Sequence, residues 1–365
     1  MAVYIGSEIY RRSAFGDNHP LSYARQESVL DMCRVLGWLD ENNFIISPTA
    51  DITTLTRYHD KKYVQALKNA DASGSVSVDV RKQFNFGTME NPVFKGVFKR
   101  AATTIGGSIE AAKQALSGEV AFHPSGGTHH GMKGRAHGFC YFNDPVYAIL
   151  TLLDAGLERV LYVDIDAHHG DGVEAAFLRD GRVTTLSVHE ENRWPYSGKL
   201  EAGNKTHINL PVPPQLNDSE FLYIFENLLR PTCEAVKPQA IVITCGADAL
   251  DADPLSKMAL SNRVLWQTVM ELRASTEHFV VLGGGGYNPW TTVRAWVGLW
   301  GLLSGKVLPK TLPKEAQAIL ARFDSDLIDE EDRLPEWITR LEDEETMGEI
   351  RSEVKRRVNL IASLR

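Results

Sequence analysis

The sequence predicts an α/β fold in which a central, mostly parallel β-sheet is flanked by helices. Two observations support this prediction. The runs VLYVDID and AIVITCGAD are apolar almost throughout, which is typical of strands buried on both faces of a parallel sheet. Strand-like segments also alternate along the chain with segments of helical length, and this alternation favours right-handed crossovers between parallel strands.

Six short apolar runs, bounded by Gly, Asp or Asn, are expected to be strands: residues 2–5, 120–123, 160–166, 183–189, 240–245 and 279–283. Seven longer segments are expected to be helices: residues 22–37, 60–69, 94–116, 145–155, 219–236, 261–275 and 291–303. No internal repeat or low-complexity linker interrupts the alternation, so we expect a single domain over most of the chain.

The composition changes near residue 310. Pro309 and Pro313 precede a charged region, and residues 324–345 include eleven acidic and two basic side chains. The final segment, 348–364, has apolar residues at helical intervals, which predicts a helix lying on the rest of the protein; these are Ile350, Val354, Val358 and Ile361. We therefore expect a main domain at 1–310 and a charged, helical C-terminal extension at 311–365 packed on it.

The overall composition excludes several classes of protein. Hydrophobic residues make up 43% of the 365 residues and charged residues 24%, as in ordinary globular chains. The formal net charge of −8 argues against a general nucleic-acid binder, although residues 324–345 carry −9 of it and leave the remainder at +1. That acidic stretch is expected to be a solvated face or a docking strip for a basic partner.

Neither a membrane span nor an oxidising compartment is expected. The longest uncharged apolar stretch, 295–305, falls well short of the roughly 20 residues that a spanning helix needs. The first residues, MAVYIGSEIYRR, lack the layout of a signal peptide. The four cysteines include no CxxC pair, which favours reduced thiols and a cytoplasmic protein.

The most informative segment follows the expected strand at 160–166. If the extended conformation persists, Asp164, Asp166 and His168 project to one side at a period of two. Carboxylate oxygens and imidazole nitrogens suit Zn²⁺, and also Fe²⁺ or Mn²⁺. The simpler alternative is that these residues only cap the next helix, with Asp171 as its N-cap. Two aspartates leading out of an apolar strand into adjacent histidines favour the metal site.

A third ligand would have to come from another strand end, because sites in parallel sheets form along the carboxyl edge. Asp248 lies directly after the run AIVITCG. Alone it reads as a helix cap or an Asx-turn, but beside the first cluster it is a credible third ligand. Three protein ligands leave one position open, which is typical of a catalytic metal site.

Two further strand ends carry candidate catalytic groups. His129 and His130 follow the strand at 120–123, and adjacent histidines can titrate near neutral pH, bind metal or simply lie on the surface. Four glycines at 283–286 precede Tyr287. No Lys-Ser/Thr pair follows them, so they are not a phosphate-binding loop. Tyr287 is expected either to be presented by this turn or to pack beneath it.

Taken together and in this order, the motifs resemble the histone deacetylase family, on its class I-like side and including its bacterial acetoin-utilisation deacetylase-like branch. The matching segments are NHP at 18–20 with Arg25, GTMENP at 87–92, GGTHH at 126–130, GFCYFND at 138–144, DIDAHHGDG at 164–172, GAD at 246–248 and GGGGY at 283–287. The resemblance implies the three-layer arginase/deacetylase fold and hydrolysis of an acetamide to an amine and acetate.

The resemblance also implies two metal sites. It makes Asp166, His168 and Asp248 the ligands of a catalytic Zn²⁺, or of Fe²⁺. The region from Asp164 to Ser187 resembles the structural monovalent-cation site of the family, usually occupied by K⁺.

The same resemblance assigns catalytic roles. His129 and His130 would flank the attacking water, with Asp164 and Asp171 as their respective carboxylate partners. Tyr287 would donate a hydrogen bond to the oxyanion. Of the two histidines we expect His130 to be the general base and acid, while His129 acts electrostatically.

The substrate would occupy a tunnel. Gly138 and Phe139 would form one wall and Glu90 would sit at the rim, where the family often has Asp. Trp194, before a proline, is the expected second wall, in a stretch that departs from the family pattern. Arg25 would lie near an internal acetate pocket.

Two other positions depart from the class I pattern. Thr128 stands where many relatives have Leu, and His137 where they have Ser. These differences leave the expected chemistry intact and bear on the choice of substrate. Asp171, where many class II relatives have Asn, favours the class I-like side.

The leading functional hypothesis is removal of acetyl groups from lysine side chains of proteins, for example of an acyl-CoA synthetase. Small acetylated amines such as acetylpolyamines are the alternative substrates. A catalytically silent acyl-lysine-binding protein is less expected, because every catalytic position is filled. A two-manganese ureohydrolase of the arginase branch would need further metal ligands. Neither nucleic acid nor membrane is an expected partner.

Overall fold

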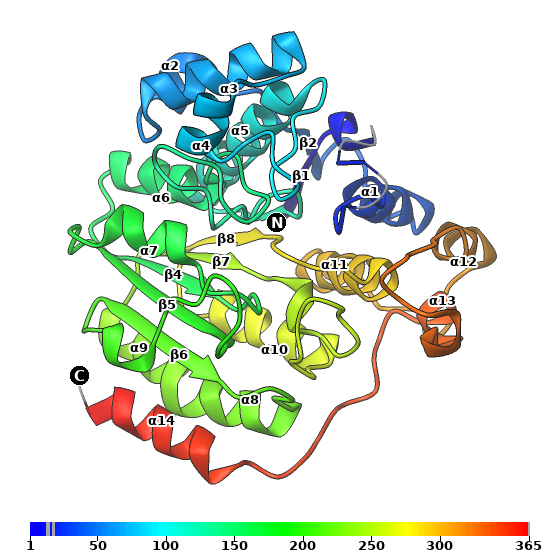
Figure 1. Cartoon of the computed structure of the whole chain (residues 1–365). Coiled ribbons are helices and arrows are strands. Elements are labelled where there is room, and N and C mark those ends of the chain that lie inside the picture. The colour runs from blue at the N-terminus through cyan, green and yellow to red at the C-terminus, as the bar shows by residue number, and fades with distance from the viewer. Residues whose placement is uncertain (12–14, 17–18, 364–365) are drawn as a thin grey trace.

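The computed structural model describes residues 1–11, 15–16 and 19–363, so that Asn18 and Leu364 of the sequence motifs lie outside it. Its centre is an eight-stranded sheet in the order β2-β1-β3-β8-β7-β4-β5-β6 (Figure 1). All neighbouring strands pair in parallel. The strands are β1 (Ala2–Gly6), β2 (Phe44–Ile46), β3 (Val120–His123), β4 (Val160–Asp164), β5 (Val183–Glu190), β6 (His207–Val212), β7 (Ala240–Thr244) and β8 (His278–Leu282).

The six expected strands are all present, and the two strands that were not expected lie at the edges of the sheet. β2 consists of three apolar residues, Phe-Ile-Ile, and is shorter than the apolar runs of four to eight residues that indicate a strand. β6 contains Pro211, which argues against a strand in the centre of a sheet but is tolerated at an edge. Both additions are parallel, which makes the sheet parallel throughout.

Helices cover both faces of the sheet, and alternate residues of each central strand point to opposite layers. In β4, Leu161 and Val163 belong to the apolar core with α1, α10 and α11, whereas Val160 and Tyr162 belong to the core with α5 and α6. These helices are α1 (Arg25–Val35), α10 (Asn262–Arg273), α11 (Pro289–Leu303), α5 (Val97–Leu116) and α6 (Asp144–Asp154). The predicted three-layer α/β fold is therefore confirmed.

The remaining helices differ from expectation mainly where they are short. The unexpected helices have four to seven residues each: α2 (Ile52–Leu55), α4 (Val78–Phe84), α7 (Asp171–Phe177), α12 (Lys314–Leu320) and α13 (Glu336–Thr339). α3 (Lys61–Ser73) packs with α2, α4 and α5 around a smaller apolar cluster. The helix expected at 219–236 is α8 (Asp218–Ile224) and α9 (Arg230–Val236), joined by a π-helical turn at Phe225–Leu229. Pro231 at the start of α9 lacks the N–H that a regular α-helix would need there.

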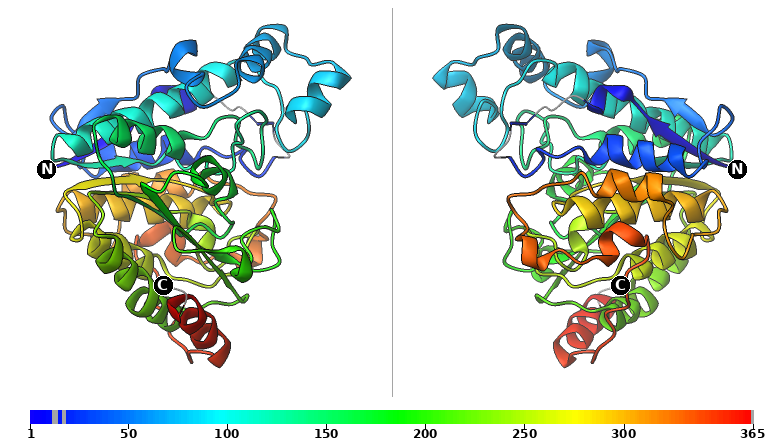
Figure 2. Two further views of the ribbon diagram at one scale, coloured as in Figure 1. Left: turned by 90° about the vertical axis from the view of Figure 1, so that its left-hand side faces the viewer. Right: turned by 90° about the vertical axis from the view of Figure 1, so that its right-hand side faces the viewer.

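After α13 the chain runs across the molecule to the C-terminal helix (Figure 1), which lies at one end of the molecule in both views of Figure 2. α14 (Ser352–Ser363) lies within the segment expected to be helical and buries Val354, Val358 and Ile361. The acidic stretch is partly anchored, because the buried Arg294 of α11 pairs with Asp343 at 2.7 Å. Among the described residues, no helix is both long and apolar enough to cross a membrane.

Candidate active site

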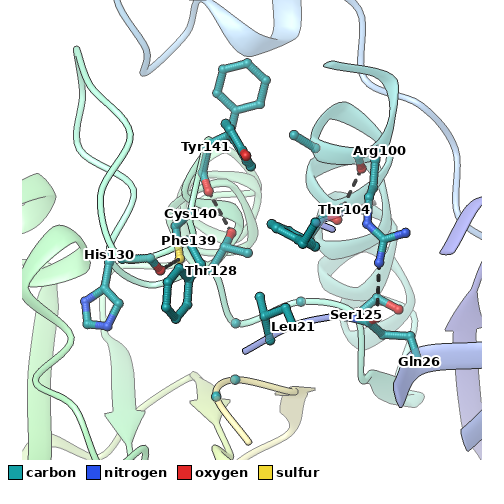
Figure 3. A pocket seen from close by; sticks show the side chains of 18 of the residues that line it. Leu21, Gln26, Arg100, Thr104, Ser125, Thr128, His130, Phe139, Cys140 and Tyr141 are labelled. Atoms are coloured by element: carbon teal, nitrogen blue, oxygen red, sulfur yellow. Dashed lines mark hydrogen bonds between the residues drawn. The ribbon is translucent and has the colours of Figure 1, made fainter. Parts of the chain in front are cut away.

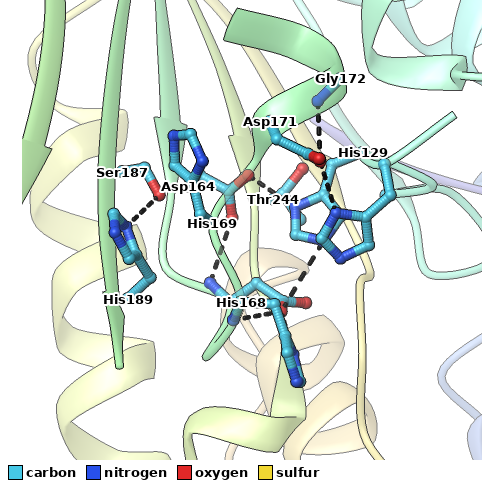
Figure 4. Close-up of polar contacts among 12 residues, drawn as sticks. His129, Asp164, His168, His169, Asp171, Gly172, Ser187, His189 and Thr244 are labelled. Carbon is cyan, nitrogen blue, oxygen red and sulfur yellow. Dashed lines mark hydrogen bonds and ion pairs between the residues drawn. The ribbon is translucent and has the colours of Figure 1, made fainter. Parts of the chain in front are cut away.

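The expected metal-binding and catalytic residues converge at the carboxyl edge of the four central strands, at the ends of β3, β4, β7 and β8. Figure 4 shows those that come from β3 and β4. Parallel strands end at the same edge, so residues far apart in the sequence meet there. Glycines let the loops approach closely: a Cβ at Gly285 would lie 2.0 Å from an oxygen of Asp248, and one at Gly246 would lie 2.3 Å from Asp166.

Asp166, His168 and Asp248 form a buried cluster whose ligand atoms lie within 4.8 Å of one another. His168 Nδ1 lies 2.9 Å from Asp248 Oδ2 and 3.2 Å from Asp166 Oδ1. The expected period-two arrangement is wrong in its detail, because β4 ends at Asp164. A turn then follows, in which Asp164 accepts a hydrogen bond from the N–H of Asp166, and Asp166 accepts one from the N–H of His168.

The charges in this cluster suit a divalent cation. Burial favours neutral His168, but hydrogen bonds with Asp166 and Asp248 outweigh burial and raise the pKa of His168 to about 10. Burial and the neighbouring charge of Asp166 raise the pKa of Asp248 to about 6. Two buried carboxylates thus share one imidazolium as their cation. A metal ion bound by the same three side chains would neutralise both carboxylates and leave the imidazole uncharged, so these residues fit a Zn²⁺ or Fe²⁺ site.

The two histidines expected to act on water lie side by side, with ring centroids 3.9 Å apart. Each has its own carboxylate: His129 Nδ1 is 2.7 Å from Asp164 Oδ2, and His130 Nδ1 is 2.7 Å from Asp171 Oδ1. Burial opposes the charge on His129, but Asp164 and Asp166 outweigh it and raise its pKa to about 9. Burial and the charge of His129 lower the pKa of His130 to about 3. The pair therefore contains one charged and one neutral imidazole.

Tyr287 is buried, and its ring centroid lies 6.3 Å from that of His168 and 6.0 Å from that of Phe139. Its backbone N–H donates to Asp253 Oδ2 at 2.7 Å. Asp253, itself buried, also accepts a hydrogen bond from the N–H of Leu255. Sequence reasoning missed this carboxylate, which fixes the loop that carries Tyr287. Its only signal was an acidic residue five positions after Asp248.

A cavity above the cluster has aromatic walls and is lined by Glu90, His130, Gly138, Phe139, His168, Asn192, Arg193, Trp194, Tyr196, Leu255 and Tyr287. Trp194 packs edge-on to His130, with ring centroids 4.6 Å apart. Glu90 lies at this cavity as expected, and its carboxylate accepts a hydrogen bond from the N–H of Gly138 at 2.5 Å. The four expected tunnel residues, Glu90, Gly138, Phe139 and Trp194, therefore lie around one opening.

Residues 19–303 match the family model of the histone deacetylase domain. The chain belongs to the histone deacetylase family. It is 32% identical over 315 residues to the acetoin utilization protein AcuC of Bacillus subtilis, with 82% of this chain and 81% of that protein covered. It is also similar to the crystal structure of a histone deacetylase homologue from Aquifex aeolicus, with a TM-score of 0.95 and 34% identity over 99% of both chains. A structure of a homologue in complex with SAHA gives a TM-score of 0.94 at 34% identity and the same coverage.

Arg25 of this family member lines a second, inner cavity that also reaches His129, His130 and Tyr287. Its guanidinium donates to the carbonyls of Gly284 and Gly286 at 3.1 and 3.2 Å. Arg100 lines the same cavity (Figure 3), which was not expected from the sequence. The cavity therefore has a cationic wall behind the cluster.

Ser187 of β5 lies beside Asp164 of β4 in the register of the sheet. Its hydroxyl is hydrogen-bonded to His189 Nδ1 at 2.9 Å. The monovalent-cation site expected between these two strands stays a prediction.

Two positions that depart from the class I pattern contact the site. Thr128 donates from its backbone N–H to Asp144 at 2.7 Å and from its hydroxyl to the carbonyl of Phe142 at 2.7 Å. His137 lies next to Asp171, with Nδ1 3.2 Å from Asp171 Oδ2. The Thr128 hydroxyl therefore makes hydrogen bonds that an apolar side chain could not make.

Gly138 has no space for a side chain. Its φ is +53°, and a Cβ there would lie 2.3 Å from the Trp194 ring and 2.6 Å from His130. The substitution Gly138→Ala is expected to displace the tunnel wall and reduce kcat/KM by about 10²-fold, the cost of a misplacement of about 1 Å. Gly181→Ala, at an exposed glycine with open space around it, is the matched control. Equal kcat/KM for both variants would contradict the prediction.

The loop that carries the histidine pair is held by a buried chain of hydrogen bonds. His59 Nδ1 donates to the carbonyls of Met132 and Lys133 at 3.1 Å, and His59 Nε2 accepts from the N–H of Asn143 at 3.1 Å. The Asn143 amide donates in turn to the carbonyl of His129 at 3.0 Å. Burial lowers the pKa of His59 to about 4, so the ring is neutral in the folded protein.

Because His59 is neutral in the folded protein, we expect the free energy of unfolding to fall in acid. Because its pKa is lower in the folded than in the unfolded chain, its contribution is complete above about pH 6.5 and lost as the pH falls towards 4. We expect the free energy of unfolding of the wild type to fall over this range by about 3 kcal/mol more than that of His59→Gln, since one pKa unit corresponds to about 1.4 kcal/mol. Denaturant unfolding of both metal-free proteins at several pH values measures the difference, and parallel curves would refute it.

Proposed function

We propose that this protein hydrolyses acetyl groups from amide nitrogen, most directly from acetyl-lysine of proteins. One observation carries the proposal: the buried Asp166, His168 and Asp248 cluster lies beside a neutral His130 and beneath an aromatic cavity that also contains Tyr287. Membership of the histone deacetylase family supports it.

Asp166, His168 and Asp248 would hold Zn²⁺, or Fe²⁺. When bound, the metal polarises the amide carbonyl and lowers the pKa of water at the site. His130 then accepts the proton of the attacking water at Nε2, because Nδ1–H is directed to Asp171. The same proton returns to the nitrogen of the leaving amine. His129, charged and held by Asp164, stabilises the negative charge that develops nearby.

Tyr287 acts on the carbonyl oxygen. As the tetrahedral intermediate forms, negative charge moves to this oxygen, and a hydroxyl donor stabilises it more than the neutral carbonyl. Burial keeps the pKa of Tyr287 well above its usual value, so the hydroxyl retains its proton. Asp253 supports this role by holding the backbone of Tyr287.

The tunnel and the inner cavity bind different parts of the reactants: the tunnel takes the aliphatic chain of the substrate, and the inner cavity takes the acetate product. Phe139 and Trp194 enclose the aliphatic chain of the substrate. Gly138 allows Trp194 to approach closely, and Glu90 accepts a hydrogen bond from the Gly138 N–H. In the inner cavity Arg25 offers a cation to the acetate product. For the structural cation we propose K⁺ at Asp164 and Ser187.

The remaining assignments are also proposals. We divide the chain into a catalytic domain at 1–310 and an extension at 311–365, which the packing of α14 against the body supports. We place the protein in the cytoplasm, which its small number of cysteines, four with no CxxC pair, supports. An acetylated protein such as an acyl-CoA synthetase is the proposed partner, and small acetylated amines are the alternative.

A turnover panel tests the substrate class. The purified metal-loaded protein is compared on acetyl-lysine peptides, longer acyl-lysine peptides, acetylpolyamines and small N-acetyl compounds, with and without a chelator. Preference for acetyl-lysine peptides, abolished by chelation, is the expected result. Selective turnover of acetylpolyamines would support the alternative substrate, whereas peptide binding without turnover would indicate a silent binding protein.

A further inference from the structure

A second cluster of metal-binding side chains lies on the side of His130 that faces away from the first. It consists of His130, His137 and Asp171, whose ligand atoms lie within 4.8 Å of one another. The Asp171 carboxylate stands between the two rings, with Oδ1 2.7 Å from His130 Nδ1 and Oδ2 3.2 Å from His137 Nδ1. His137 is the member that departs from the class I pattern.

The Nδ1 atom of His137 is available to bind a metal ion. This atom is buried and, within the part of the chain that the structure describes, makes no hydrogen bond of good geometry despite the nearby carboxylate. The ring is held against Trp194, with centroids 4.6 Å apart. About one fifth of the His137 side chain is exposed (22%), so the cluster lies close to the surface of the protein.

Two imidazole nitrogens and one carboxylate oxygen form a donor set that suits Zn²⁺ and other late first-row metals. A single ion bound by His130 Nδ1, His137 Nδ1 and Asp171 would replace the present contact between Asp171 and His130. We propose that His130, His137 and Asp171 form a second, inhibitory site for Zn²⁺ in this protein.

The inhibition follows from the tautomer of His130. Because the Asp171 carboxylate can only accept a hydrogen bond, the proton of neutral His130 lies on Nδ1 and points to Asp171, which leaves Nε2 free to accept a proton. An ion bound at Nδ1 displaces this proton, which a neutral imidazole can carry only on Nε2. His130 then has no lone pair for the attacking water. This consequence rests on the proposed role of His130, whereas binding of the second ion does not.

Zinc titration of the full chain tests both parts. The protein holding one equivalent of Zn²⁺ is titrated with further Zn²⁺ by calorimetry and equilibrium dialysis, and turnover of an acetyl-lysine peptide is followed in parallel. The wild type is expected to bind a second equivalent and to lose activity as it does so. His137→Ser is expected to bind one equivalent and to keep its activity at excess Zn²⁺. His278→Ser, at the opposite end of β8 where His278 bonds the carbonyl of Ala115, is expected to behave as the wild type.

Each outcome has a definite meaning. A wild type that binds one equivalent, or a His137→Ser variant that still binds two, overturns the second site. Two bound equivalents with unchanged activity overturn the inhibition. Binding of two ions by a protein with no turnover at all leaves the site standing and refutes the proposed function. Circular dichroism checks the fold of His137→Ser, and His137→Asn, whose amide is a poor ligand, repeats the test.

Discussion

Replacing Asp166 by alanine is expected to abolish metal binding and turnover together. Asp166 is fully buried and lies 3.2 Å from His168 Nδ1, and its second oxygen accepts a hydrogen bond from the N–H of Gly285. Without it the site retains only His168 and Asp248. Because the bound metal supplies several kcal/mol of transition-state stabilisation, kcat/KM should fall by at least about 10³-fold, at about 1.4 kcal/mol for each factor of ten.

Metal content measured by elemental analysis after dialysis, together with kcat/KM, checks this prediction. The control is Asp180→Ala, which removes a carboxylate that pairs with Arg182 at the surface and should leave both quantities unchanged. Circular dichroism of the metal-free variant checks its fold, because Asp166 also accepts hydrogen bonds from the backbone N–H groups of His168 and Gly285. An Asp166→Ala protein that holds one equivalent of metal and turns over at the wild-type rate would show that the cluster is not the catalytic centre.

The site was predictable because parallel strands bring their carboxyl ends to one edge. Strands β4 and β7 are apolar or aromatic up to their last residues, Asp164 and Thr244, so these ends could be predicted from the sequence to within two residues. The polar residues after each end then had to meet. The family motifs added the pairing of His129 with Asp164, which the structure contains at 2.7 Å.

The features that could not be predicted depend on contacts between distant segments. Asp253 reads as an ordinary loop carboxylate until β8 brings the backbone of Tyr287 to it. His59 reads as the end of a turn, yet it supports Asn143, which lies 84 residues away. The edge strand β2 owes its conformation to pairing with β1. In each case the local sequence carries no periodic signal, and tertiary packing decides the structure.

The two histidines of the site should respond differently to substitution. Both His129→Ala and His130→Ala remove an imidazole that pairs with an aspartate, but only His130 is uncharged near neutral pH and so has a nitrogen lone pair to offer the attacking water. We expect His130→Ala to lower kcat by about 10²- to 10⁴-fold, the usual contribution of general acid and base catalysis. His129→Ala should lower kcat less, because it removes a charge near the reacting centre and no proton acceptor.

Chemical rescue with added imidazole distinguishes the proton acceptor, His130, from the electrostatic group, His129. A small base that diffuses into the space left by His130→Ala can take the proton of the attacking water, so kcat should rise with imidazole concentration. In His129→Ala the proton acceptor is still present, and the missing positive charge was held by two carboxylates, Asp164 and Asp166, which neutral imidazole does not replace. Metal content is measured for both variants, since imidazole also binds metals. Rescue of His129→Ala, with no rescue of His130→Ala at equal metal content, would reverse the assignment of general base to His130.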